Sequence, residues 1–344
     1  MDEEAKLLIE LQDFFQEGVV IVVGSGLSAR YGLPGMPHLA DHLQATVPSS
    51  LAAADEVAWN DIVRELKAGR GLEAALQSKA VSEGLLQILV RESAACIEEK
   101  ERDLLRSIAT GLAISPISHL IGHILKSSRD IHIVTPNYDR LIECQLERAN
   151  IPINTSYVGS YLAWYDSERS AIAQKEYILD GKRIRTVHHR HVCIHKPHGS
   201  LDWYVQNNQV IRSFERLELP RAIITPGLAK YRVGYSLYYD QQRSAAARAL
   251  EKAQRVLVIG YGFNDDQLEH SWCPGLTTSK RLVILTKNLT PNALTLLSSS
   301  GTAIALCEDP NNPLNALVYR GCATPKSFSK RLWDLDIFVR EVIR

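Results

Sequence analysis

The chain has 344 residues, with 39 lysines and arginines against 39 aspartates and glutamates, so its formal net charge is zero. This balance excludes the strong positive field of a protein that binds nucleic acid through its charge. The longest apolar runs, such as residues 19–23 and 256–259, are far shorter than a membrane-spanning helix. The length suffices for one large α/β domain or for a domain with an inserted lobe.

The first residues and the cysteines indicate the compartment. Asp2-Glu3-Glu4 lacks the basic and then apolar order of an export signal, which predicts a soluble, cytoplasmic protein. No cysteine belongs to a Cys-x-x-Cys pair, and the six lie far apart, at positions 96, 144, 193, 273, 307 and 322. This spacing argues against a disulfide framework and against a zinc ribbon, and it favours small buried residues.

The amino-terminal region predicts a helix, a buried strand and a glycine-rich turn. Residues 3–17 place apolar side chains at helical spacing, and the run VVIVV at 19–23 is typical of a buried parallel strand. The turn Gly24-Ser25-Gly26 would let the backbone approach a pyrophosphate and point amides at anionic oxygens, unless its glycines serve packing alone. Ala29 stands where a dinucleotide oxidoreductase would carry its third glycine. The turn therefore predicts a phosphate-containing ligand outside that class.

Residues 38–128 show mostly helical patterns, and we expect helices near 38–46, 55–68, 71–78, 82–107 and 116–126. So long a connection between two strands exceeds a simple crossover. We therefore expect a helical lobe inserted beside the ligand cleft.

A strand at 131–135 ends at Pro136, and a helix is expected at 139–150. Asn137 therefore lies at the carboxyl end of a strand, where ligands of open α/β sheets collect. The Asn-x-Asp pair formed with Asp139 is well placed for chemistry. The alternative is that Asn137 merely caps the following helix.

Residues 151–190 predict loops with a β-hairpin, its strands near 176–179 and 182–187. The stretch from His188 to His198 is rich in histidine, which suggests a metal site. No cysteine or carboxylate stands at a standard ligand spacing from it, so we expect no metal there. A strand at 192–196 leads into a turn at 197–200. This turn places His198 at another strand end.

The carboxyl-terminal third predicts strands at 221–225, 256–260, 282–286 and 302–306, with helices at 235–253, 265–271 and 291–299. Asn264 or Asp265 would cap the second of these helices. Gly262, in the turn after the strand at 256–260, allows a close approach of a ligand. Residues 328–344 are amphipathic and could close the core or bind a partner.

Short blocks in a fixed order resemble the sirtuin family from about residue 15 to about residue 310. They are Gly24, Gly26 and Ser28 of the glycine loop, Gly32-Leu33-Pro34, Thr135-Pro136-Asn137-Tyr138-Asp139, His198-Gly199, and Gly260-Tyr261-Gly262-Phe263. The resemblance implies a doubly wound parallel α/β sheet of Rossmann-like, sirtuin type with an inserted helical lobe. It implies an NAD-binding domain of residues 1–37 and 129–327, the lobe at 38–128, and a terminal helix at 328–344.

The resemblance also implies a site that binds NAD and breaks its nicotinamide–ribose bond. Asn137, His198 and Asp139 would be catalytic, with Asp139 either orienting the other two or holding the nicotinamide side. Asn137 would bind a ribose hydroxyl or a water, and His198 would accept a proton near neutral pH. The residues expected to bind NAD are Gly24, Ser25, Gly26, Ser28, Gly260, Gly262 and Phe263.

The departures from the family pattern concern the acceptor of the ADP-ribosyl group. The chain lacks the four-cysteine zinc ribbon of the deacylases, and Gly35-Met36-Pro37 replaces their acidic-Phe-Arg sequence. Pro136 replaces the usual glutamine. These changes leave water as the simplest acceptor and resemble the bacterial antiphage NAD hydrolases, so we expect no zinc and no cofactor beyond NAD as substrate.

Such an activity must be silent until it is needed. We therefore expect a homo-oligomer, a sensor or regulatory partner protein, or both. Two other functions stay open, namely a non-catalytic module that binds NAD or ADP-ribose, and a deacylase or ADP-ribosyltransferase. The sequence leaves the trigger and the choice between NAD and NADP open.

Overall fold

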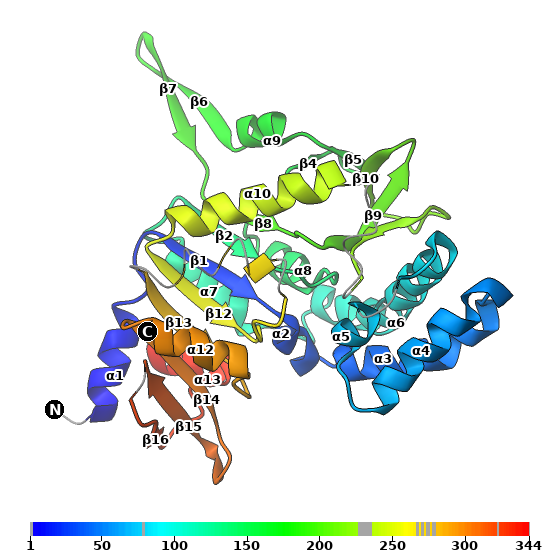
Figure 1. The fold of residues 1–344 in the computed structure, drawn as a ribbon. Helices are drawn as coiled ribbons and strands as arrows, with labels where there is room; N and C mark the ends of the chain where they lie inside the picture. The colour runs from blue at the N-terminus through cyan, green and yellow to red at the C-terminus, as the bar shows by residue number, and fades with distance from the viewer. Residues whose placement is uncertain are drawn as a thin grey trace.

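The computed structural model describes residues 3–77, 80–225, 236–265, 268–269, 272, 276, 280–321 and 323–343. Within these residues, nine strands form the main sheet, in the order β16-β15-β14-β13-β12-β1-β2-β8-β3 (Figure 1). They are β1 (Val19–Val23), β2 (Asp130–Val134), β3 (Ile153–Asn154), β8 (His191–His195), β12 (Arg255–Ile259), β13 (Arg281–Leu285), β14 (Ala303–Asp309), β15 (Asn312–Arg320) and β16 (Lys326–Phe328).

In the described part of the chain, the main sheet is parallel from β3 to β14, and β15 pairs antiparallel with both β14 and β16. β1 lies near its middle, and all five of its residues are buried, as a strand covered on both faces requires. Each valine or isoleucine of β1 is matched to a residue of β12, from Val19 opposite Arg255 to Val23 opposite Ile259. The strand at 19–23 is thus confirmed at its predicted bounds.

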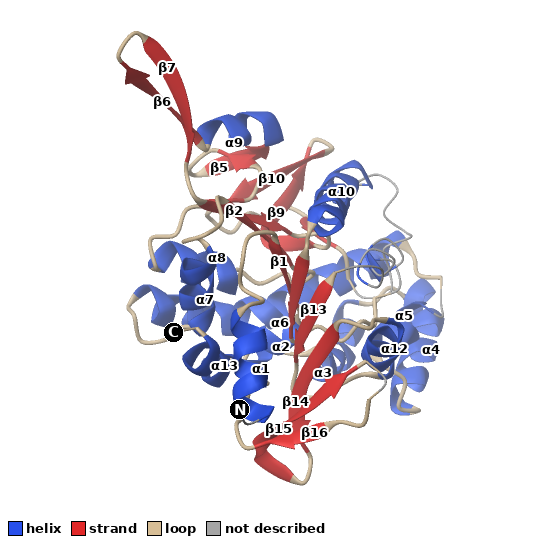
Figure 2. Ribbon diagram, turned by 90° about the vertical axis from the view of Figure 1, so that its left-hand side faces the viewer, coloured by secondary structure: helices blue, strands red, loops and turns tan. Residues whose placement is uncertain are grey.

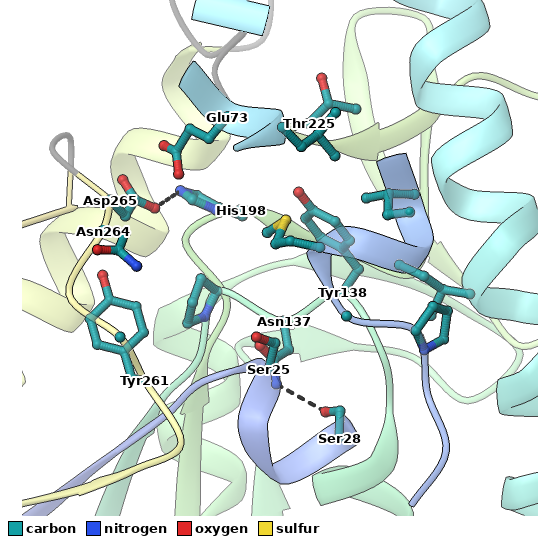
Figure 3. Close-up of a pocket in the computed structure, with 18 of the residues that line it drawn as sticks. Ser25, Ser28, Glu73, Asn137, Tyr138, His198, Thr225, Tyr261, Asn264 and Asp265 are labelled. Atoms are coloured by element: carbon teal, nitrogen blue, oxygen red, sulfur yellow. Dashed lines mark hydrogen bonds and ion pairs between the residues drawn. The ribbon is translucent and has the colours of Figure 1, made fainter. Parts of the chain in front are cut away.

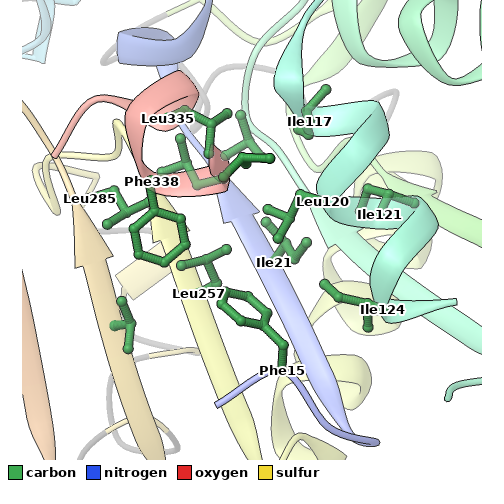
Figure 4. Close-up of a cluster of buried hydrophobic side chains, with 14 of the residues drawn as sticks. Phe15, Ile21, Ile117, Leu120, Ile121, Ile124, Leu257, Leu285, Leu335 and Phe338 are labelled. Atoms are coloured by element: carbon green, nitrogen blue, oxygen red, sulfur yellow. The ribbon is translucent and has the colours of Figure 1, made fainter. Parts of the chain in front are cut away.

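Helices cover both faces of the sheet, so the doubly wound fold class is confirmed (Figures 1 and 2). One face carries α1 (Glu3–Gln12), α7 (Pro116–Ile124), α8 (Leu141–Arg148) and α13 (Leu335–Val342). The other carries α10 (Ser236–Lys252) and α12 (Pro291–Ser299). Phe338 of α13 is fully buried and meets Phe15 edge to face, with ring centroids 5.8 Å apart (Figure 4). The carboxyl-terminal helix therefore closes the core.

The predicted helical region between the first two strands contains α2 (Ser25–Arg30), α3 (Met36–Thr46), α4 (Glu56–Lys67), α5 (Leu72–Gln77) and α6 (Glu83–Ala109). Short 3-10 turns at Val47–Ser50 and Ala53–Asp55 link α3 to α4. Helices α3 to α6 share an apolar cluster apart from the two clusters against the sheet. α7 instead packs against the sheet with α13 (Figure 4). The proposed division into domains stays a prediction.

A second sheet was not predicted. Its order within the described residues is β11-β9-β10-β5-β4, from β11 (Arg221–Ile223), β9 (Gly199–Gln206), β10 (Gln209–Ser213), β5 (Leu162–Tyr165) and β4 (Tyr157–Val158). The sequence of β9, GSLDWYVQ, contains polar residues that are not typical of a buried strand, although its first seven residues are buried. The predicted hairpin is confirmed as β6 (Lys175–Asp180) and β7 (Arg183–His188), which follow α9 (Ser167–Ala173) and project from the body (Figure 1).

Some predictions fall partly or wholly outside the described residues. They include most of the helix expected at 265–271, Cys273 and Cys322. Among the helices that the structure describes, none combines the length and the apolar character that a membrane span needs.

Candidate functional site

The loops that follow β1, β2, β8 and β12 meet at the carboxyl edge of the main sheet around a cavity of about 490 Å³. These strands are parallel neighbours, so their carboxyl ends share one edge. Asn137, from the loop after β2, and His198, from the loop after β8, both line this cavity (Figure 3). The helical region supplies another wall, through Met36 and Leu39 of α3 and Glu73 of α5.

The glycines of the first loop serve the packing of two loops against each other. The amide of Gly24 donates to Ile259 O and that of Gly26 to Gly260 O, both at 2.9 Å. A Cβ on Gly26 would lie 2.7 Å from Gly260 Cα, so only glycine fits there. Neither amide is free for an anionic ligand, and the packing interpretation holds for both. Ser25, the first residue of α2, is exposed and lines the cavity.

Asn137 and Asp139 are joined through Ser28. The Asn137 Nδ2 donates to Ser28 Oγ at 3.0 Å, and Ser28 Oγ donates to Asp139 Oδ2 at 2.7 Å. Because Ser28 gives its one proton to the carboxylate, it must accept from Asn137, which turns the amide oxygen of Asn137 away from Ser28. The helix-cap interpretation of Asn137 is wrong, since the amide of Leu141 at the start of α8 donates to Asp139 Oδ1 at 3.2 Å.

Asp139 is 8% exposed, and its burial raises its pKa, although Lys196 and the hydrogen bond from Ser28 oppose that shift. Lys196 is 2% exposed and lies beneath the site. Its Nζ donates to Asp139 O at 2.5 Å, to Glu143 Oε1 at 2.9 Å and to Ser200 Oγ at 3.2 Å. A buried cation thus ties the loop after β2 to β8 and α8.

His198 faces a carboxylate that sequence analysis assigned only to helix capping. Its Nε2 lies 3.1 Å from Asp265 Oδ2, and each side chain is 14% exposed (Figure 3). Asp265 also caps as expected, because its Oδ1 accepts from the amide of Leu268 at 3.1 Å. Burial lowers the pKa of His198, while Asp265 raises it and Arg243 lowers it further. The imidazole is therefore kept neutral near pH 7.

Only some of the residues expected to bind NAD line the cavity. Ser25, Ser28, Gly260 and Gly262 line it together with the three expected catalytic residues, Asn137, Asp139 and His198. Gly24, Gly26 and Phe263 are not among its lining residues. Phe263 is 2% exposed and packs on Tyr261, with ring centroids 5.0 Å apart, so it belongs to the core beneath the loop.

Several lining residues were missed by sequence analysis. Thr225 is 1% exposed, and its Oγ1 has no hydrogen-bond partner among the described residues although it lines the cavity (Figure 3). Glu73 of α5 faces the pair formed by His198 and Asp265 (Figure 3). No local signal marks Glu73, because only the packing of the helical region brings it to the sheet. Thr225 closes the strand predicted at 221–225, so its place at a strand end could have singled it out.

The side chains of the histidine-rich stretch at 188–198 lie in different parts of the structure. His189 lies beside Glu176 of the projecting hairpin at 3.7 Å, whereas His195 contacts His132, with 2.9 Å between His195 Nε2 and His132 Nδ1. In the part of the chain that the structure describes, no cluster of three or more His, Cys, Asp or Glu side chains could hold a metal ion.

Residues 131–301 match the family model of the SIR2-like domain. Among solved structures, the chain is similar to a Sir2 homologue–NAD complex, with 14% identity, a TM-score of 0.41, and coverage of 85% of this chain and 86% of that chain. It is similar to Sir2 bound to acetylated peptide, with 12% identity, a TM-score of 0.36, and coverage of 85% and 89%. It is also similar to a structure described under the mechanism and regulation of Sir2 enzymes, with 12% identity, a TM-score of 0.39, and coverage of 85% of this chain and 88% of that chain. No curated protein matches the sequence.

Proposed function

We propose that the chain, whose residues 131–301 match the SIR2-like domain, binds NAD in the cavity at the carboxyl edge and hydrolyses it to nicotinamide and ADP-ribose. The observation that carries this proposal is that Asn137 and His198, from separate loops, line one cavity. Its volume of about 490 Å³ lies within the range of small-molecule sites.

The nicotinamide of NAD leaves as a neutral ring from a cationic linkage, so cleavage needs no strong acid. It needs groups that stabilise an oxocarbenium-like ribose and place a nucleophile on the opposite face. Asn137 is suited to this task because Ser28 holds its Nδ2 and leaves its amide oxygen to accept from a ribose hydroxyl or a water. Asp139 acts on Asn137 through Ser28, as a positioning residue.

His198 would accept the proton of the attacking water or of a ribose hydroxyl. Its lowered pKa keeps the ring able to take a proton near pH 7, and Asp265 at 3.1 Å stabilises the imidazolium that forms. The hydroxyl of Thr225 supplies a further buried polar group for the bound dinucleotide.

Water is the simplest acceptor for a sequence that lacks the zinc ribbon and the acidic-Phe-Arg segment of the deacylases. We extend the proposal to a regulated effector of bacterial antiphage defence that depletes NAD and is controlled by oligomerisation or a partner protein. Helices α3 and α5 line the cavity, so a protein that docks on the helical region could change the site directly.

The test is release of nicotinamide from NAD by the purified chain, alone and with candidate partners. Asn137→Ala and His198→Ala should each lower turnover by about 10²- to 10⁴-fold with an unchanged fold. Matched controls are Asn60→Ala and His119→Ala, whose side chains are exposed on α4 and α7. Binding without nicotinamide release would favour a sensor module, and release that requires an acylated peptide would favour a deacylase. Full turnover in both site variants would exclude these assignments.

A further inference from the structure

A second cavity, of about 450 Å³, lies at the opposite end of the same strands. It is bounded by α10 and by the amino ends of β1 and β2, and Val19, Arg129 and Lys252 are among its lining residues. The first cavity shares no lining residue with it. The chain therefore presents two separate hollows at the two edges of one sheet.

Three cations line this second cavity. Arg248 and Lys252 stand four residues apart on α10 and so share one helix face, and Arg129 directly precedes β2. Within the described residues, none of these three side chains forms an ion pair or a hydrogen bond. Like charges around one hollow repel each other, and an anion between them would remove that repulsion.

A buried hydroxyl supports a ligand independently of the charges. Ser128 lines the cavity and is 4% exposed, and its Oγ has no hydrogen-bond partner among the described residues. Buried polar groups are nearly always paired, so this hydroxyl calls for a partner that the protein itself does not provide.

The two acidic residues of the wall, Asp130 and Glu17, offset two of its three cations and leave one net positive charge. The carboxylate of Asp130 lies 3.6 Å from His132 Nε2, and this contact lowers the pKa of Asp130. Glu17 is the other carboxylate, and it is exposed. His195 adds no charge, because burial, with His132 and Arg248 nearby, lowers its pKa to about 3.

We propose that this cavity binds a small phosphorylated molecule, whose phosphate is held by Arg129, Arg248 and Lys252 and by the hydroxyl of Ser128. Guanidinium groups bind phosphate through paired hydrogen bonds, and the volume exceeds that of a lone phosphate, so it leaves room for the rest of the molecule. α10 links the two cavities, since Gln242 Oε1 accepts from the amide of Lys196 at 3.1 Å. A ligand at the amino edge would thus contact the helix that also supports the carboxyl edge.

The experiment is calorimetric titration of the full chain with inorganic pyrophosphate at low ionic strength. Arg129→Ala/Arg248→Ala should weaken binding by at least about tenfold, because it removes two charge-assisted contacts. Glu17→Gln should tighten binding by removing a like charge. Ala245→Phe should abolish binding by filling the cavity without changing any charge, and it tests the site even if the arginine variant fails to fold.

Two controls separate this cavity from general surface charge and from the first cavity. Arg102→Ala/Arg106→Ala removes two exposed arginines of α6 and should leave the affinity unchanged. His198→Ala alters the first cavity and should also bind normally. Equal affinity in the wild type and in the Arg129/Arg248 and Ala245 variants, or equal losses in all variants, would overturn the proposal. Its outcome does not depend on whether NAD is hydrolysed.

Discussion

The two ends of β1 and β2 differ in how the charges around them are satisfied. At the carboxyl edge, the buried Lys196 makes three hydrogen bonds, and Ser28 joins Asn137 to Asp139. At the amino edge, Arg129 and Arg248 are exposed around a cavity and have no side-chain partner among the described residues. Fixed contacts suit a site whose side chains must hold one geometry, whereas unpaired charges suit a site completed by its ligand.

Removal of a cation at the carboxyl edge should have the largest effect on stability. Lys196→Met leaves Glu143, which is 5% exposed, as a buried and unpaired carboxylate. We expect a loss of about 3–5 kcal/mol in the free energy of unfolding, measured in urea. The control is Lys330→Met, whose partially exposed pair with Glu341 should contribute less than about 1 kcal/mol.

The double variant Lys196→Met/Glu143→Leu checks the cause of that loss. It should recover most of the lost stability, because an apolar pair replaces a buried ion pair at little cost. No recovery would show that Lys196 acts through Asp139 and Ser200 rather than through Glu143.

The contact between the loops after β1 and β12 should tolerate no side chain. Gly260 has a φ of +60°, and a Cβ there would lie 2.7 Å from Gly26 Cα. Gly260→Ala should therefore cost about 1–3 kcal/mol of stability. Nicotinamide release should also fall, because the loop carrying Asp265 shifts relative to His198. Gly122→Ala, in helix α7 with open space around it, should instead stabilise the chain by up to about 1 kcal/mol.

His195, which ends β8 and lines the second cavity, should affect the pH dependence of stability. The pKa of His195 is lowered to about 3 in the folded chain, against about 6.5 in an unfolded one. The native state thus binds fewer protons within this window, so stability is lost as the pH falls from about 6.5 toward 3. In His195→Gln, the loss between pH 6.5 and pH 5 should be smaller by about 1.6 kcal/mol. Parallel curves for wild type and variant would contradict this assignment.

Removal of a cation at the amino edge should have the smallest effect. Arg248→Ala should change the free energy of unfolding by less than about 0.5 kcal/mol, because its side chain is exposed and unpaired among the described residues. Inorganic pyrophosphate should raise the melting temperature of the wild type more than that of this variant. A loss comparable to that of Lys196→Met would erase the contrast between the two edges.

Six parallel strands of the main sheet, β1, β2, β8, β12, β13 and β14, could be predicted because strands covered on both faces are rich in apolar residues, whereas β3, β15 and β16 were missed. The sequence shows this pattern directly at residues 19–23 (VVIVV) and 256–259 (VLVI). The second sheet could not be predicted from its strands. β9 includes Ser200 and Asp202 among its buried residues, and β10 pairs with β5 far upstream. Such pairing depends on distant partners rather than on local pattern.

The sequence by itself determined the doubly wound fold and placed Asn137 and His198 at strand ends, since parallel strands end at one edge. Tertiary structure alone decided that Asp265 faces His198, that Ser28 orients Asn137, and that Lys196 is buried beneath both. Each of these contacts joins residues that lie far apart along the chain, and residue spacing in the sequence does not fix where their side chains point. A side chain's neighbours across a sheet are set by packing, and packing is a property of the whole fold.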